Sequence, residues 1–434
     1  MNIFFKVWIG QLISSLGSGI TGFALSVWVF QTTGSTSLFA LASLAATLPD
    51  LLLAPAAGVV ADRYDRRLII LIGELGGLVC ALLASWLLFT GQSNVWLICL
   101  LVAGTSVFNA FRIPAWNASI SMLVPAERLN QANGMVQMSQ ALPMLAAPLI
   151  AGVLVGLIGV HGVILIDVAS FALATVSLML VRFPALPSRE GQAKSSALAE
   201  VLEGWSYIRE RAGLMGLLIF IFAVNFFTGM AQISITPLVL SVSTAAVLGT
   251  IMSVGGVGML VGSVLMSAWK GPRRKVNGVL AFTALCGLCL ASFAFFPVGP
   301  LVAIPCFFMM LCVPFLLGMY QSIWQRKVAP HLQGRVFALQ GMVTRLAAPM
   351  TYLLVGPLTD NVFEPLMAPD GGLATSLGAI LGVGKGRGSA LLLLIEGGML
   401  TGVAIASYLA PSIRQVEDDL PDSVAETPVA VPTP

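Results

Sequence analysis

Three carboxylates, Asp50, Glu74 and Glu396, stand inside long apolar stretches of the chain. A charge inside a membrane is unfavourable unless it is paired, hydrated or protonated, so such residues mark ion and substrate pathways. Burial favours the protonated form of a carboxyl group, which a group that exchanges protons near neutral pH requires. We predict that one of these three candidates couples transport to protons: Asp50 first, because alanine and glycine share its helical face, and Glu396 or Glu74 next. A structural, hydrogen-bonded role for Asp50 is the alternative.

Other charged residues in these stretches predict a polar interior. Glu74 and Arg112 lie at similar depth on neighbouring segments, so we expect an ion pair that acts as a structural lock, a charge relay or a cavity wall. We favour the lock, because pairing is how such charges are usually tolerated. Asp167 lies near the end of its segment, where we expect it to be half-hydrated. Arg345 is placed to attract an anionic substrate group or to oppose a carboxylate across a cavity.

Amides and thiols are the remaining polar candidates. Asn225 and Gln232 share one apolar segment and are predicted to face a cavity, since an amide exposed to lipid is unfavourable. All six cysteines lie in apolar stretches, where a thiol packs as a small hydrophobic group. Cys286 and Cys289 have the spacing of metal ligands but lack a second pair, so we predict neither a metal site nor a bound cofactor. The two histidines fall in loops and no HExxH helix is present, which argues against a membrane enzyme.

The composition predicts an all-α membrane protein. Of 434 residues, 57% are hydrophobic and 9% are charged, against roughly 45–50% and 25% in an average soluble domain. A helix crosses a bilayer with about 20 apolar residues. The net charge of +3 offers no basic face for nucleic acid. Twelve segments are long enough to cross, at 4–30, 38–61, 68–90, 95–121, 133–159, 161–181, 213–240, 247–269, 277–297, 300–324, 336–360 and 389–410.

Basic residues fall mainly on one side of this predicted topology. With the N-terminus in the cytoplasm, eighteen of the 22 lysines and arginines lie in inner loops and only Lys385 and Arg387 lie in an outer loop. Cytoplasmic loops of membrane proteins carry this excess. We therefore expect an even number of crossings and both termini in the cytoplasm.

A short internal repeat predicts that the chain consists of two pseudo-symmetric six-helix bundles. The tetrapeptide Leu-Ala-Ala-Pro at 145–148 in the fifth segment recurs at 346–349 in the eleventh. Parallel repeats of this kind build one large group of transporters. The predicted parts are an N-terminal bundle at 1–181, a cytoplasmic linker with an amphipathic helix at 182–212, a C-terminal bundle at 213–410 and a disordered cytoplasmic tail at 411–434.

The loop between the second and third segments contains the most specific motif of the chain. Residues 58–67 read Gly-Val-Val-Ala-Asp-Arg-Tyr-Asp-Arg-Arg, which resembles the G-x-x-x-D-R-x-x-R-R signature of the major facilitator superfamily. In that family the loop latches the two halves on the inner side, and the resemblance implies this gating role for Gly58, Asp62, Arg63 and Arg67. A loop that only sets topology would explain the arginines but not Gly58 and Asp62.

The fifth segment resembles a second pattern of the superfamily, G-x8-G-x3-G-P-x2-G-G, which is associated with exporters that exchange substrate for protons. The matching positions are Gly134, Pro143, Ala147, Pro148, Ala151 and Gly152, with the spacing kept and three glycines replaced. Alanine still permits close helix packing. The resemblance implies export by antiport, and ordinary small-residue packing is the alternative.

Stretches in both halves resemble a narrower branch, the macrolide-efflux and siderophore-export proteins of bacteria. They lie at 111–115, 124–125, 129–133, 166–171, 203–209 and 324–336. The resemblance implies a monomeric transporter of the inner membrane that exports an amphipathic small molecule, such as a drug, a siderophore or another secondary metabolite, by proton antiport. Proton-coupled uptake, flipping of a lipid-like substrate, a polytopic membrane enzyme and a sensor without transport activity stay open as alternatives.

Overall fold

The computed structural model describes residues 2–91, 94–125, 128–181, 197–269, 271–295, 300–329 and 332–421. In these ranges the chain is built from helices and connecting turns, with no strand. A helix satisfies its backbone hydrogen bonds internally, which is required where lipid offers no partners.

The first half of the chain forms five long helices. They are α1 (Asn2–Thr33), α2 (Thr36–Arg63), α3 (Arg66–Phe89), α4 (Val95–Leu123) and α5 (Leu129–Met179). The 51-residue α5 is broken at Gly159, whose φ of 70° is open to glycine without steric penalty. The break divides α5 into the fifth and sixth predicted crossing segments.

The second half holds a short helix, six long helices and several short elements. The long ones are α7 (Ala212–Leu240), α8 (Ala245–Ala268), α9 (Lys275–Ser292), α10 (Ala303–Lys327), α11 (Gln333–Leu358) and α14 (Arg387–Leu409). The shorter elements are α6 (Ala197–Arg209), η2 (Phe293–Phe295), η3 (Pro300–Val302), η4 (Thr359–Phe363), α12 (Glu364–Leu366), α13 (Gly378–Leu381), α15 (Pro411–Arg414) and α16 (Val416–Asp419).

Polar residues in the tight connections decide where several helices begin. Ser35 Oγ accepts from the Leu38 amide (3.2 Å), Asp65 Oδ1 from the Arg67 amide (2.9 Å) and Asn94 Oδ1 from the Trp96 amide (2.9 Å). Each satisfies an amide that has no partner in the first helical turn.

The number of crossing segments agrees with the sequence analysis. Ten helices of the described chain are long and apolar enough to cross a membrane. One of them, α5, contains two crossing segments, and the 26-residue α11 runs beside the others. The described residues therefore form twelve segments of membrane length, and the predicted all-α membrane fold is confirmed.

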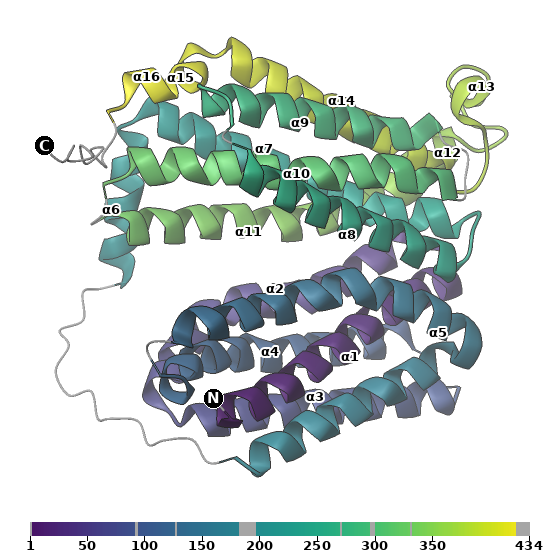
Figure 1. Cartoon of the computed structure of the whole chain (residues 1–434). Coiled ribbons are helices and arrows are strands. Elements are labelled where there is room, and N and C mark those ends of the chain that lie inside the picture. Colours follow the sequence, from purple (N-terminus) through teal and green to yellow (C-terminus); the bar gives the residue numbers. More distant parts are fainter. Residues whose placement is uncertain are drawn as a thin grey trace, which may run out of the picture.

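The helices gather into two groups that touch at one end and separate at the other (Figure 1). We call the end with α6, α15, α16 and the start of α1 the linker end and the opposite end the far end. At the far end, Gly356 of α11 lies against the backbone of Ser37 in α2, and Gly249 of α8 lies against the carbonyl of Pro148 in α5. A Cβ at either glycine would overlap with the facing helix, so glycine is what permits these approaches.

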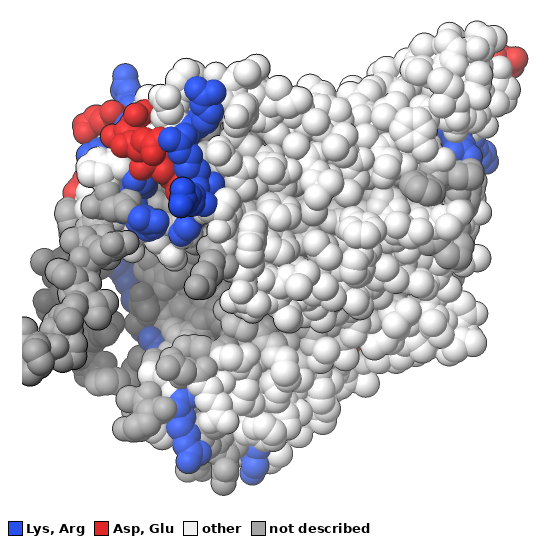
Figure 2. Space-filling view, turned by 45° about the horizontal axis from the view of Figure 1, so that its top comes forward, with Lys and Arg blue, Asp and Glu red and all other residues white. Residues whose placement is uncertain are grey.

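The surface divides into an uncharged band with charged ends. Figure 2 shows white surface over most of the long helices, with the larger group of lysine and arginine side chains at one end. Within the band, large apolar side chains such as Leu100 (66% exposed) and Val264 (67% exposed) point outward. Such a surface is suited to lipid rather than water.

The amphipathic linker helix α6 packs against protein. Ile208 is fully buried, the hydroxyl of Tyr207 donates to the carbonyl of Lys327 (3.2 Å), and Arg335 of α11 pairs with Glu203 (2.6 Å). The helix therefore docks onto the second half through Ile208 on its apolar side. Residues 182–196 of the linker lie outside the described residues.

The first part of the predicted disordered tail is ordered, which corrects the sequence analysis. Residues 411–421 form α15 and α16, and Val416 is fully buried. The Lys327 ammonium donates to the carbonyls of Glu417 (2.6 Å) and Leu420, and the Glu417 carboxylate accepts from the Val276 amide (2.8 Å). These contacts tie the start of the tail to α9 and α10, whereas residues 422–434 lie outside the described part.

We expect this docked segment to stabilise the second half. A chain ending after Ala410 should melt several degrees below the full chain, because it loses about 1.5–3 kcal/mol from burial of Val416 and leaves Lys327 without its carbonyl partners. A chain ending after Pro421 should melt with the full chain. Thermal unfolding of the three purified proteins in detergent makes the comparison, and equal melting of both truncated chains would contradict the assignment.

Candidate functional site

A cavity of about 840 Å³ lies between the two halves. Its wall is built mainly from α1, α2, α4 and α5 of the first half, with α11 of the second half opposite. The polar and charged side chains that line it are Gln11, Ser15, Thr47, Asp50, Arg112, Asn117, Ser139, Gln140 and Arg345. Its lining residues on α1, α4 and α5 belong to the linker-end halves of these helices, so the cavity lies toward the linker end, where the two groups of helices separate (Figure 1).

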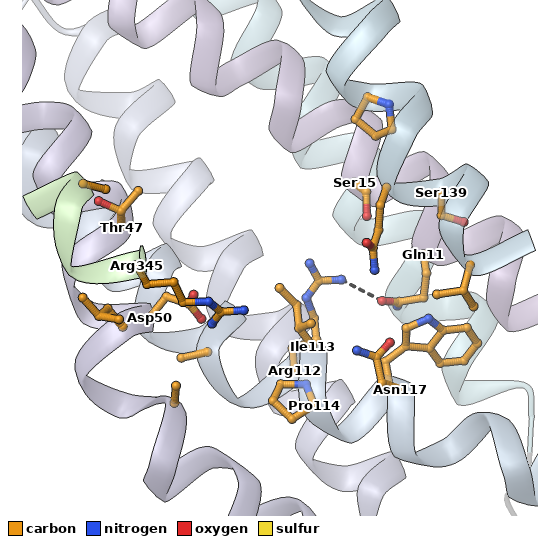
Figure 3. Close-up of a pocket in the computed structure, with 18 of the residues that line it drawn as sticks. Gln11, Ser15, Thr47, Asp50, Arg112, Ile113, Pro114, Asn117, Ser139 and Arg345 are labelled. Atoms are coloured by element: carbon orange, nitrogen blue, oxygen red, sulfur yellow. Dashed lines mark hydrogen bonds between the residues drawn. The ribbon is translucent and has the colours of Figure 1, made fainter. Parts of the chain in front are cut away.

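Asp50 and Arg345 meet at this cavity from opposite halves. Figure 3 shows the Arg345 side chain extending from α11 toward Asp50 on α2. Arg345 is exposed and Asp50 is half-buried, so both are accessible from the cavity. Among the described residues neither forms an ion pair within 4 Å, which leaves both charges available to a bound molecule.

The predicted pair of Glu74 and Arg112 is present and closed off from solvent. Arg112 Nη1 lies 2.9 Å from Glu74 Oε1, and the two residues are 6% and 0% exposed. Gln11 donates to Glu74 Oε1 (2.8 Å) and accepts from Arg112 Nη1 (2.7 Å), as the dashed line in Figure 3 marks. Ser14 donates to Glu74 Oε2 (3.0 Å), and Asn109 accepts from Arg112 Nε and Nη2 (3.0 and 2.9 Å). Multiple hydrogen bonds of this kind offset the desolvation of a buried ion pair.

Asp167 is buried, which corrects the expectation of half-hydration. It is 3% exposed and its Oδ1 accepts from Ser170 Oγ (3.0 Å) and Ser18 Oγ (3.4 Å). The carboxylate points into the first half rather than toward the far surface, because the second part of α5 packs closely against α1 at Gly17.

A polar stripe on α1 is the part of the site that the sequence analysis missed. Gln11 and Ser14 bind Glu74, Ser18 binds Asp167, and Thr21 lines the same interior pocket as Asp167. Their spacings of three, four and three residues place them on one helical face. A polar stripe at helical spacing inside an apolar segment was the available signal.

Three predicted residues lie away from the cavity. Glu396 of α14 is 1% exposed, and its Oε1 accepts from Ser234 Oγ (3.1 Å) of α7 inside the second half. Asn225 donates to the carbonyl of Ile221 in its own helix (2.8 Å). Gln232 lines a separate pocket of about 200 Å³ between the halves.

The motif at 58–67, which spans the end of α2 and the start of α3, is open in this conformation. A Cβ built on Gly58 meets no atom within 4 Å, Arg63 is exposed, and the Asp62 side chain lies outside the described part of the structure. Arg67 donates to the carbonyls of Leu178 (3.3 Å) and Met179 (3.0 Å) at the end of α5. It therefore satisfies carbonyls that the helix end leaves unpaired.

The fifth-helix motif lies where α5 meets α1 and α8. Ala147 packs against Gly19 of α1, and the backbone of Ala245 in α8 leaves no room for a side chain at Gly152. Pro143 lines the cavity, Pro148 faces α8, Ala151 is fully buried, and Gly134 faces open space. Small residues thus set a close helix approach along most of this motif.

A carboxylate closes the far end, and the sequence analysis did not single it out. Asp360, two residues after α11, accepts from Ser35 Oγ (2.7 Å), the Thr36 amide (3.0 Å) and the Ser37 amide (2.8 Å). These groups form the N-terminus of α2, where unpaired amides and the helix dipole favour a negative charge. We call this contact, together with the glycine-mediated approaches of α2 to α11 and α5 to α8, the far gate.

Two helical bundles that enclose a polar cavity, closed at one end and open at the other, define a membrane transporter that exposes its site to one side at a time. The sequence model of the Major Facilitator Superfamily matches residues 7–352. The chain therefore belongs to this superfamily, and it is a multi-pass membrane transporter rather than an enzyme.

The sequences that are similar to this chain include those of bacterial efflux proteins. Macrolide efflux protein A of Streptococcus pyogenes is 28% identical over 367 residues, which cover 83% of this chain and 90% of that protein. Multidrug efflux pump Tap of Mycolicibacterium fortuitum is 24% identical over 361 residues, which cover 80% and 87%.

Solved transporters share the fold. A bacterial homolog to the human lysosomal transporter Spinster, in an inward-facing and unoccupied conformation, has a TM-score of 0.71 at 13% identity, covering 96% of this chain and 98% of that one. The nucleoside transporter NupG has a TM-score of 0.67 at 16% identity, covering 94% and 98%. At such identities the likeness shows the fold alone.

Removing one member of the buried ion pair should be much worse than removing both. Arg112→Met leaves Glu74 charged and unpaired, a change that costs roughly 3–5 kcal/mol. Adding Glu74→Gln should recover most of the loss in melting temperature, and Arg345→Met, at an exposed position, should cost little. Melting of purified protein in detergent tests this; a double variant as unstable as Arg112→Met would contradict it.

Removing the Asp360 carboxylate should loosen the far gate. Asp360→Ala leaves the amides at the start of α2 without their acceptor, a loss of about 1–2 kcal/mol, and so shifts the population toward a far-open state. Pulsed electron paramagnetic resonance between labels at the exposed far-end positions Thr90 and Ile380 should show longer distances. Asp370→Asn removes an exposed carboxylate at the same end and should leave the distances unchanged. Identical distance distributions in wild type and Asp360→Ala would argue against the gate.

Proposed function

We propose that this transporter exports an amphipathic small molecule across the bacterial inner membrane in exchange for protons. The observation that carries the proposal is the cavity of about 840 Å³ in which Asp50 and Arg345 come from opposite halves. The relatives named for macrolide and multidrug efflux support export. We assign the linker end and both termini to the cytoplasm, because eighteen of the 22 basic residues fall there.

The cavity wall suits a cargo with an apolar body and a polar or charged group. Trp116, Ile113 and Val136 offer apolar contact area, and Asp50 and Arg345 offer charges of opposite sign. A protonated amine would pair with Asp50 and an anionic group with Arg345. Wide apolar walls with few fixed polar groups also accommodate varied cargo.

Competition at Asp50 would couple cargo to protons. Cargo from the cytoplasm binds the ionised carboxylate, the far gate opens, and a proton from outside takes the place of the cargo. The protonated form then returns to the linker-open state and releases its proton inside. Glu74 and Glu396 stay as further coupling candidates, and the cycle needs no cofactor. Because one chain lines the whole cavity, we propose a monomer as the working unit.

The moving parts in this scheme are the predicted bundles at 1–181 and 213–410. They rock about the cavity, so that the far gate opens as the loop at Gly58, Asp62, Arg63 and Arg67 closes. The closed loop would use the open space beside Gly58. The predicted linker at 182–212 joins the two bodies, and its helix α6 would move with the second half, onto which it docks.

Everted membrane vesicles test both the direction and the driving force. Respiration acidifies the interior of such vesicles, so an antiporter should accumulate a radiolabelled macrolide and lose it when a protonophore is added. Accumulation in right-side-out vesicles instead would indicate uptake. Binding without flux in either preparation would favour a sensor. Mass spectrometry of metabolites retained by cells that lack the protein would identify the natural cargo.

Asp50→Asn should separate coupling from binding. The amide cannot exchange a proton, so accumulation driven by the pH gradient should fall at least about tenfold, while equilibrium binding of the labelled macrolide stays measurable. Asp370→Asn, at the exposed far end, should accumulate cargo like wild type. Undiminished accumulation by Asp50→Asn would remove this residue from the coupling mechanism.

A further inference from the structure

A second, smaller pocket lies wholly inside the first half. It measures about 170 Å³ and is formed by α1, α2, α3, α4 and the second part of α5. Its polar lining consists of Ser18, Thr21, Thr105, Ser106, Asn109 and Asp167, and no described lysine or arginine lines it. The volume corresponds to about five water molecules at roughly 30 Å³ each, so the pocket is large enough for a hydrated or partly dehydrated ion.

Two hydroxyl groups in this pocket make no close hydrogen bond within the described part of the protein. Ser106 Oγ is buried, with a residue exposure of 4%, and Thr21 Oγ1, in a residue that is 9% exposed, faces the Asp167 carboxylate without a close bond to it. A buried hydroxyl without a partner is unfavourable, so such atoms indicate a site for a ligand. Both hydroxyls share the pocket with the Asp167 carboxylate.

The charges around the pocket do not balance. Glu74, Asp167 and Arg112 are 0%, 3% and 6% exposed, and together they sum to one negative charge when both carboxylates are ionised. Ser14 and Ser18, which are one turn or about 6 Å apart along the axis of α1, donate to the Glu74 and Asp167 carboxylates respectively. The other titratable group that lines the pocket is Cys80 of α3, and α1 contributes hydroxyl groups. A single negative charge in a low-dielectric interior requires a compensating positive charge.

We infer that this pocket binds one monovalent cation at Asp167, either a proton on the carboxylate or Na⁺ held by the carboxylate and the Ser18, Thr21 and Ser106 hydroxyls. Carboxylate and hydroxyl oxygens are the ligands that hard cations prefer. The inference rests on the proposed function in one respect: within the proposed transport cycle, this pocket would be a second site for the coupling ion, in addition to Asp50.

Asn109 connects the cation site to the cargo cavity. It lines the small pocket and accepts two hydrogen bonds from Arg112, which lines the large one. Arg112 in turn contacts Gln11 at the cavity wall. A change of charge at Asp167 therefore alters the electrostatic balance of the pair at the cavity without direct contact between ion and cargo.

Cation binding is tested on the purified full chain in detergent, without cargo. The reference condition is pH 8.5 in choline chloride. If the site binds a proton, the melting temperature of wild type should rise by several degrees on acidification to pH 6. If it binds Na⁺, the melting temperature should rise by several degrees when Na⁺ replaces choline. Asp167→Asn neutralises the excess charge, so it should start at the higher melting temperature and lose the response. Asp370→Asn should respond like wild type.

The two arms identify the ion and several outcomes overturn the inference. If the melting temperature responds to acid alone, and Asp167→Asn takes up about one proton fewer than wild type on acidification, the bound ion is the proton. If the melting temperature responds to Na⁺ at constant pH, the bound ion is Na⁺. No response of wild type to either ion, or the same response in Asp167→Asn, overturns the site. If Asp167→Asn does not fold, Thr21→Val with Ser106→Ala decides: a shifted pH midpoint or a several-fold weaker Na⁺ response supports the site, and unchanged responses overturn it. Because no cargo is used, failure of export in vesicles would overturn the proposed function alone.

Discussion

An ionised side chain away from water must be balanced by a partner, and this constraint governs the first half of the molecule. Glu74 is balanced by Arg112 and by donors from Gln11 and Ser14, so α1, α3 and α4 are joined through one carboxylate. A bundle held this way can move as a rigid body, because shifting one helix would leave a buried charge without its partner. Asp167 of α5 lies against the same face of α1, and no described lysine or arginine lines its pocket, which is why it stands out as a site for an ion.

The far gate meets the same constraint with a helix end in place of a basic residue. Asp360 is stabilised by the amides at the start of α2, so a contact between halves can form and break without exposing a lysine or arginine to lipid. Glycines complete the closure, because at Gly356 and Gly249 any side chain would hold the helices apart. At the linker end Gly58 faces open space, and the described residues there show no such glycine-mediated closure.

The two halves share a repeat but use it differently. In the first copy Ala147 packs against Gly19, while in the second copy Ala348 and Pro349 line the cavity beside Arg345. The buried carboxylate of the second half, Glu396, has one partner in Ser234 and lies away from the cavity. Charge chemistry at the cavity is thus concentrated in the first half, and the second half contributes Arg345 and the closing carboxylate Asp360.

Much of the architecture follows from the sequence, because lipid imposes a simple rule: long apolar segments become helices, and their number and loop charges set the topology. The same rule marked Asp50, Glu74, Arg112 and Arg345, since charges in apolar segments are rare. The similar depth of Glu74 and Arg112 on neighbouring segments predicted their ion pair, but the sequence left the partner of Arg345 open. Whether a carboxylate reaches the cavity, as Asp50 does, or stays inside a bundle, as Glu396 does, depends on the rotation of each helix and on packing between distant segments. The interior pocket at Asp167 and the capping of α2 by Asp360 likewise arise from contacts across 149 and more than 300 residues, which only the tertiary structure decides.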